Sequence, residues 1–281
     1  MARTMATTAV IVLLPLLVLP ALAGPPAKEE LIQQLMKLSG LDAQVRQLPL
    51  QVLASFGEQK SQLPAEVYDL TARALGAAFD AERMLKTVSK QVEASLDVGT
   101  IQAALDWLQS GLGRKITGLE EAASTPQAYQ QIQTYAKQLE NRPPPQPRLL
   151  LVRRLDVATN ATETVVSIAE TVAMSVAMAL DAIQPKELQT GVERLKKQME
   201  LQRSQMRQGL QQQMTAAMLY TYQTLSDAEL DQYIGFYESH AGKVYQQGLN
   251  AALKGALSEA SESAGKNLAD VVRQLRRKQG A

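Results

Sequence analysis

The sequence predicts an all-α fold, a multi-helix bundle built from two related helical units. Apolar residues recur at intervals of three and four almost throughout, and segments that alternate with a period of two are missing. Ala, Leu, Gln and Met are plentiful, and these residue types favour helices. Two stretches, residues 95–123 and 224–252, align without a gap, which indicates one helical unit used twice.

The matches between the two stretches fall on positions that define helices, their caps and their crossing points. The aligned pairs are Leu96 with Leu225, Trp107 with Phe236, Ser110 with Ser239, Gly113 with Gly242, and Arg114 with Lys243. We expect each aromatic residue to be largely buried and packed between the two arms of its own helical hairpin.

Residues 1–23 have the layout of an export signal peptide. Arg3 supplies the positive charge, residues 9–22 form an apolar stretch, and Ala21-Leu22-Ala23 is a small-residue cleavage site. The apolar stretch is shorter than the roughly 20 residues that cross a bilayer. We therefore expect cleavage between Ala23 and Gly24, and a periplasmic or secreted mature chain without a transmembrane segment.

The composition excludes several classes of site. The chain has no cysteine, so it forms no disulfide, no thiolate metal site and no lipid anchor at the cleavage point. Without Arg3, basic and acidic side chains are equal in number, which argues against nucleic acid as the main partner. With 46% apolar residues, the chain is expected to be held together by its core alone.

The N-terminal unit is expected to span residues 24–140. Helices are predicted at 28–38, ending near Gly40; at 41–56, kinked or divided at Pro49; and from Pro64 to about residue 94. Asp97 caps the next helix, and Gly113 lies in the turn before 116–123. A helix led by Pro126 completes the unit.

A proline-rich linker at 141–147 precedes the C-terminal unit, residues 148–281. Three consecutive prolines favour an extended connector. Residues 149–155 open the second unit, and 160–183 form an unusually apolar helix. Because Glu163, Glu170 and Asp181 interrupt it, we favour a buried central helix over a membrane span.

A long Gln-rich helix is expected from 186 to about 224, with a break near Gly209. Met199, Met206, Met214 and Met218 lie on one stripe of it, which is either core or a promiscuous hydrophobic groove, and we favour core. The last helix, 254–278, is expected to break near Gly265. Its basic tip is either a solvated helix end or a contact for an anionic lipid or polymer.

The most specific motif lies between Ser226 and Lys243. Ser226 and Glu229 are spaced as a capping box that begins a helix. Gly242 permits either a positive φ or a close backbone approach where the chain turns into a return arm. The motif therefore predicts a helical hairpin within residues 214–257.

With these residues, the chain resembles the bacterial family catalogued as domain of unknown function 2059. The resemblance covers 214–257 and rests on the capped start at 225–230, the pair Phe236 and Tyr237, and Ser239 with Gly242 and Lys243. The first copy departs from the family pattern, having Leu108 after Trp107 and Arg114 in place of the lysine. The resemblance implies an exported, all-helical protein with no assigned biochemical activity.

Two interpretations of the motif residues remain open. Tyr237, Ser239, His240 and Lys243 could form a polar site at the turn; alternatively, packing, capping and solvation explain each of them, and we favour this second interpretation. Asp227 and Asp231 could hold a cation weakly, but a solvated acidic face is expected. His240 is the single histidine. No metal site, cofactor site or catalytic motif is predicted.

Three functional classes remain. The first is a non-enzymatic cell-envelope protein that binds an envelope protein or itself through a helical surface. The second is a carrier of a small hydrophobic ligand, which requires a continuous cavity of more than a few hundred cubic ångströms. The third is a hydrolase using Ser239 or the carboxylates, which requires these groups to converge in a concave site.

Overall fold

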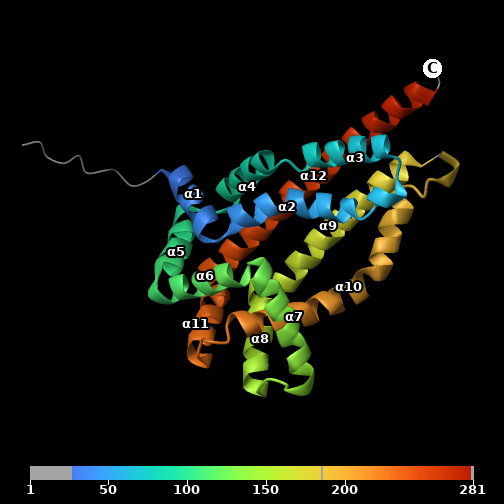
Figure 1. Ribbon diagram of the computed structural model, residues 1–281. Helices are drawn as coiled ribbons and strands as arrows, with labels where there is room; N and C mark the ends of the chain where they lie inside the picture. Colours follow the sequence, from blue (N-terminus) through green and yellow to red (C-terminus); the bar gives the residue numbers. More distant parts are fainter. Residues whose placement is uncertain (1–26, 185, 280–281) are drawn as a thin grey trace, which may run out of the picture.

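The computed structural model describes residues 27–184 and 186–279, and within them the chain forms helices and no strand (Figure 1). This confirms the predicted all-α multi-helix bundle. The predicted signal peptide, residues 1–23, and its cleavage site lie outside the described residues. The α-helices are α1 (Lys28–Leu38), α2 (Leu41–Gly57), α3 (Ala65–Ala78), α4 (Ala81–Ser95), α5 (Val98–Gln109), α6 (Gly111–Ala123), α7 (Pro126–Asn141), α8 (Gln146–Thr159), α9 (Ala161–Ile183), α10 (Val192–Thr221), α11 (Asp227–Glu238) and α12 (His240–Gln279).

Two predictions for the N-terminal helices differ from the structure. The helix expected from Pro64 to residue 94 is two helices, because the chain leaves helical geometry at Phe79 and the Asp80 side chain caps α4 by accepting from the Arg83 amide. Pro49, expected to kink or divide the second helix, lies inside the unbroken α2. The backbone group that Pro49 lacks is one N–H, and the rest of the helical ladder continues around it.

Several helix boundaries in the C-terminal part differ from the prediction. The linker 141–147 is shorter, because α8 already begins at Gln146 and a proline fits the first turn of a helix. The helix expected from residue 186 begins at Val192, after a short 3₁₀ turn (Lys186–Leu188). Neither Gly209 nor Gly265 breaks its helix, and the expected return arm and last helix are one continuous α12. The predicted restart at Pro185 lies outside the described residues.

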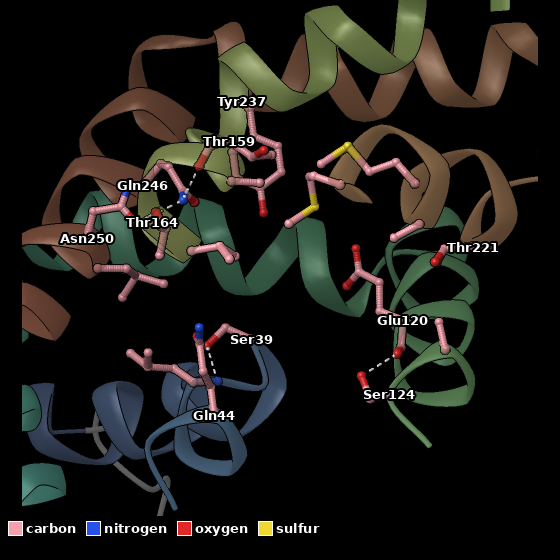
Figure 2. A pocket seen from close by; sticks show the side chains of 18 of the residues that line it. Ser39, Gln44, Glu120, Ser124, Thr159, Thr164, Thr221, Tyr237, Gln246 and Asn250 are labelled. Atoms are coloured by element: carbon pink, nitrogen blue, oxygen red, sulfur yellow. Dashed lines mark hydrogen bonds between the residues drawn. The ribbon is translucent and has the colours of Figure 1, made fainter. Parts of the chain in front are cut away.

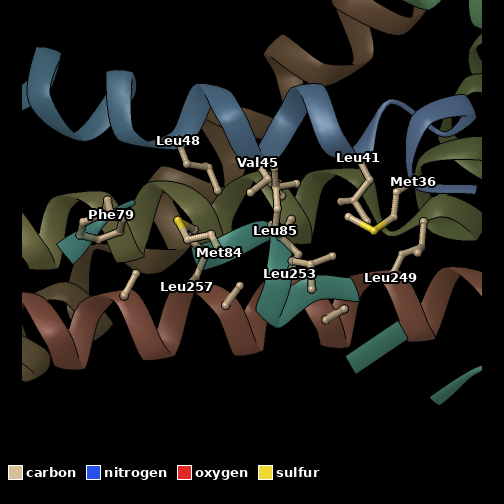
Figure 3. Close-up of a cluster of buried hydrophobic side chains, with 14 of the residues drawn as sticks. Met36, Leu41, Val45, Leu48, Phe79, Met84, Leu85, Leu249, Leu253 and Leu257 are labelled. Atoms are coloured by element: carbon tan, nitrogen blue, oxygen red, sulfur yellow. The ribbon is translucent and has the colours of Figure 1, made fainter. Parts of the chain in front are cut away.

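Two hydrophobic clusters hold the bundle together. The larger one joins α1 to α5 with α9 and α12, and the smaller one joins α6 and α8 with α10 and α11. Figure 3 shows part of the larger cluster, with Met84 and Leu85 of α4 between the side chains of α2 and those of α12. Both clusters therefore draw on residues from either side of 141–147.

The apolar helix α9 is central but only partly buried. It packs against α2, α3, α8, α10 and α12, yet few of its side chains are fully enclosed. Glu163 pairs with Arg203 and Arg207 of α10, and Glu170 also pairs with Arg203. Within the described residues, one segment, Ala161–Ala182 of α9, has the length and apolar composition of a membrane span. The prediction of a buried helix is thus only partly correct.

The methionine stripe of α10 behaves differently along its length. Met218 is buried, and Ala216 and Leu219 beside it belong to the core. Met199, Met206 and Met214 are only half-buried. The predicted core stripe is therefore core only near the C-terminal end of the helix, where Met218 and Leu219 belong to the smaller hydrophobic cluster.

The two aligned stretches have the same backbone geometry at their corners. Ser110 and Ser239 each connect two helices, with φ and ψ of −64° and 164° in the first and −65° and 163° in the second. Asp97 and Ser226, which also align, both cap the start of the helix that follows them with their side chains. These positions agree with the predicted use of one helical unit twice.

The predicted hairpin is instead a corner of one residue. Only Ser239 separates α11 from α12, and a hairpin of two antiparallel helices needs a connection of about two to five residues. The α12 helix leads away from α11, and its C-terminal end extends beyond the other helices (Figure 1).

Candidate ligand-binding cavity

The capping box predicted at Ser226 and Glu229 is present. The Ser226 hydroxyl accepts from the Glu229 amide, and the Glu229 carboxylate accepts from the Ser226 amide at 2.8 Å. Glu229 also pairs with Lys115 of α6 at 2.6 Å. Lys115 and the Ser226 donors lower the pKa of Glu229 to about 2. These two motif residues start α11 and attach it to α6.

Ser239 and Gly242 form the corner itself. The Ser239 hydroxyl donates to the Phe236 carbonyl at 2.6 Å and accepts from the Gly242 amide at 3.0 Å. A Cβ atom on Gly242 would lie 2.0 Å from the Phe236 carbonyl oxygen, and one on Gly113 would lie 2.0 Å from that of Trp107. Of the two roles predicted for Gly242, close backbone approach is therefore the one present.

The aromatic pair of the motif joins the two repeats. Phe236 stacks on Trp107, with ring centres 5.0 Å apart and planes 6° from parallel. Both side chains are half-buried, so the expectation that each is enclosed in its own hairpin is wrong. Stacking of a residue on its aligned counterpart is the pattern that a local two-fold relation between the repeats produces.

The polar residues expected at the turn do not converge on one point of the described structure. His240 and Lys243 are exposed, and the Ser239 hydroxyl is occupied by the cap. Tyr237 instead lines a cavity (Figure 2). Asp227 and Asp231 pair with Arg148 and Arg154 respectively.

That cavity has a volume of about 510 Å³ and is lined by residues of eight helices, α2 and α6 to α12. Figure 2 shows Glu120 on the opposite side of it from Gln246 and Asn250. Exposed Ser124 and Tyr129 lie at its rim, where it opens to solvent. The lining residues are Ser39, Leu41, Gln44, Glu120, Ala123, Ser124, Tyr129, Ile132, Thr159, Ala161, Thr164, Val165, Met214, Ala217, Met218, Thr221, Tyr222, Tyr233, Tyr237, Tyr245, Gln246, Leu249, Asn250 and Leu253.

Glu120 is hydrogen-bonded to two tyrosines in the cavity wall. The Tyr222 hydroxyl donates to Glu120 Oε1 at 2.7 Å, and the Tyr233 hydroxyl donates to the same oxygen at 2.8 Å. Tyr233 packs edge-on against Tyr222 and Tyr237. The Glu120 carboxylate thus holds two tyrosines in place: Tyr222, directly after α10, and Tyr233, within α11.

Burial controls the ionisation of this group. Removal from water raises the pKa of Glu120 above its ordinary value, while the two tyrosine hydroxyls act in the opposite direction. Burial and the nearby Glu120 charge raise the pKa of Tyr222 and of Tyr233. The tyrosines therefore remain protonated donors at neutral pH.

Sequence reasoning missed Glu120, Tyr222 and Tyr245 as site residues. A signal for Glu120 exists: with Gly113 and Ile116 it occupies one face of α6, so a carboxylate lies on an apolar stripe. Tyr222 follows the end of α10 and Tyr245 lies in the second turn of α12. Only the packing of these helices brings their side chains together.

No known protein family, no curated protein and no solved structure matches this chain.

Proposed function

We propose that this chain is an exported, non-enzymatic protein of the cell envelope that binds a small hydrophobic ligand. The cavity of about 510 Å³ is the observation that carries the proposal. Its volume falls within the range of about 300–1,000 Å³ of small-molecule sites. Apolar and aromatic residues make up most of its wall, and nine other polar residues complete it. This favours the carrier interpretation over surface association as the principal role.

Export and the family resemblance support the location of this role. The signal-peptide layout of residues 1–23 and the resemblance of 214–257 to domain of unknown function 2059 both indicate an exported helical protein. N-terminal sequencing of the exported chain should begin at Gly24. We assign α9 to the bundle rather than to a membrane, because five helices pack against it and its acidic residues pair with α10.

Trp107 provides a direct readout of cavity binding, because the single tryptophan stacks on Tyr233, which lines the cavity. Titration of the mature chain with 1-octanol should change its tryptophan fluorescence in a saturable way. Calorimetry should give the same dissociation constant.

A matched pair of substitutions tests whether the probe occupies this cavity. Ala123 lines it, whereas the neighbouring Ala122 is exposed and does not. Ala123→Phe should fill part of the space and abolish octanol binding, and Ala122→Phe should leave it unchanged. Equal binding by both variants, or no binding by the wild-type chain, contradicts the carrier role.

Association with an envelope protein or with a second copy is the second candidate. Leu150 and Val157 of α8 are 61% and 80% exposed, and their spacing places them on one face of the helix. Such an apolar face is suited to a protein partner. If the chain self-associates there, Leu150→Ser with Val157→Ser should convert an oligomer to a monomer in sedimentation velocity.

A further inference from the structure

Glu120 has one carboxylate oxygen that the protein itself does not use. Oε1 accepts both tyrosine hydrogen bonds, while Oε2 accepts none from the described residues. Nor does Glu120 take part in an ion pair within the described part of the chain, in contrast to Glu163, Glu229 and Glu238, which face arginine or lysine.

The surroundings of Glu120 supply no positive charge. Among the described residues that line the cavity, Glu120 is the single acidic side chain, and no lysine, arginine or histidine accompanies it. Glu120 is half-buried, and a carboxylate that is partly withdrawn from water without a cation is costly to ionise. A ligand that carries a positive charge would remove this cost, because it would supply the missing counter-ion.

The aromatic wall favours the same kind of ligand. Tyr222, Tyr233 and Tyr237 border the cavity next to Glu120. Aromatic rings attract cations within about 6 Å of the ring centre. Met214, Met218 and Leu249 also line the cavity and provide apolar surface for a hydrocarbon group.

We propose that the ligand is an amphipathic organic amine, whose ammonium group donates to Glu120 Oε2 and whose apolar part lies against Met214, Met218 and Leu249. This inference deepens the proposed carrier function and rests on it. An ammonium ion retains the two tyrosine hydrogen bonds to Oε1 and completes the carboxylate with a charge-assisted bond.

The test compares three probes of equal chain length, n-octylamine, 1-octanol and octanoate, on the mature chain by calorimetry and Trp107 fluorescence. Octylamine should bind roughly ten- to a hundredfold more tightly than octanol, as expected for a hydrogen bond between charged groups, and octanoate most weakly. Glu120→Gln should remove the advantage of octylamine, because it weakens octylamine binding far more than octanol binding. Glu121→Gln is the matched control, because Glu121 is exposed on the same helix and outside the cavity.

A pH series on the wild-type chain gives an answer even if Glu120→Gln does not fold. An alkyl ammonium stays charged between pH 5 and 8, as lysine does. Tyr222, Tyr233 and Tyr237 face Glu120 and have raised pKa values, so they do not titrate in this range. Glu120, whose pKa is raised by burial, is therefore the group in this site that gains a proton toward low pH and loses its attraction for the ammonium. Octylamine should bind more weakly at pH 5 than at pH 8, while octanol should not.

The outcomes separate this inference from the carrier function. Equal affinities for octylamine and octanol, tighter binding of octanoate, or full octylamine affinity in a folded Glu120→Gln chain would overturn the amine assignment and leave the carrier function standing. Failure of all three probes to bind would overturn both.

Discussion

Single residues fix the two corners of this bundle, and Gly242 is the clearest example. Gly242 has only a hydrogen atom where the Cβ atom of any other residue would lie 2.0 Å from the Phe236 carbonyl oxygen. Backbone cannot move aside as the end of a flexible side chain can. Ser239 adds two hydrogen bonds that hold the ends of α11 and α12 in this geometry.

Gly242→Ala should lower the free energy of unfolding by about 1–3 kcal/mol, because the new methyl group forces the two helices apart. Gly235→Ala is the control: Gly235 lies inside α11 with nothing within 4 Å of an added Cβ. That change should stabilise the chain by about 0.5–1 kcal/mol. Urea unfolding of both variants measures the difference, and equal effects would contradict the close approach.

Glu120 makes stability depend on pH. Because the folded protein raises its pKa, the folded chain binds this proton more tightly than the unfolded chain does. The stabilisation is complete below the ordinary glutamate pKa of about 4.3 and is lost as the pH rises through the folded pKa. Stability is measured as the urea midpoint of unfolding from pH 4 upward. Glu120→Gln should reduce the decrease of this midpoint with rising pH. An unchanged slope would show that Glu120 is ionised at little cost.

At the scale of helices, caps decide where elements begin. Asp80, Asp97, Ser110, Thr125 and Ser226 each accept a backbone hydrogen bond at the start of a helix. These residue types satisfy amide groups that the first turn leaves without partners. Asp80 shows the effect most clearly, because it divides what the apolar spacing alone predicts to be one helix.

Ser226→Ala should destabilise the chain by about 1 kcal/mol through loss of the cap, and Asp97→Ala, at the aligned position, by a similar amount. Exposed Ser258 lies inside α12 and provides the control, since Ser258→Ala should stay within about 0.5 kcal/mol of the wild type. Thermal melts followed by circular dichroism give the comparison. A neutral Ser226→Ala would mean that the capping box contributes little to α11.

At the scale of the whole molecule, α12 connects segments far apart in the sequence. It packs against α3, α4 and α5 from the N-terminal part and against α9 and α11 from the C-terminal part. Leu249, Leu253 and Leu257 of α12 belong to the same cluster as Leu41, Val45 and Leu48 of α2 (Figure 3). The larger core therefore requires both parts of the chain.

Separate fragments 24–140 and 141–281 should each lack a cooperative unfolding transition, because each would expose its half of a shared core. The full mature chain should unfold in one transition, with coincident midpoints from circular dichroism and Trp107 fluorescence. Recovery of cooperative unfolding when the two fragments are mixed would support this account. A fragment 24–140 that melts cooperatively alone would contradict it.

The sequence by itself determined the fold class, most helices, the capping box and the two matching serine corners. These depend on local spacing: apolar periodicity, cap residues and glycines act within a few positions of the chain. The alignment of Ser110 with Ser239 and of Gly113 with Gly242 was visible in the sequence, and their common geometry follows from it.

Only the tertiary structure decided where the aromatic residues and Glu120 meet. Trp107 stacks on Phe236, and Glu120 contacts Tyr222 and Tyr233, across more than a hundred positions. No local pattern encodes such separations, because they depend on the crossing of helices that share a core. The cavity arises for the same reason: it is the space that eight helices leave between them, with one carboxylate and its tyrosines in the wall.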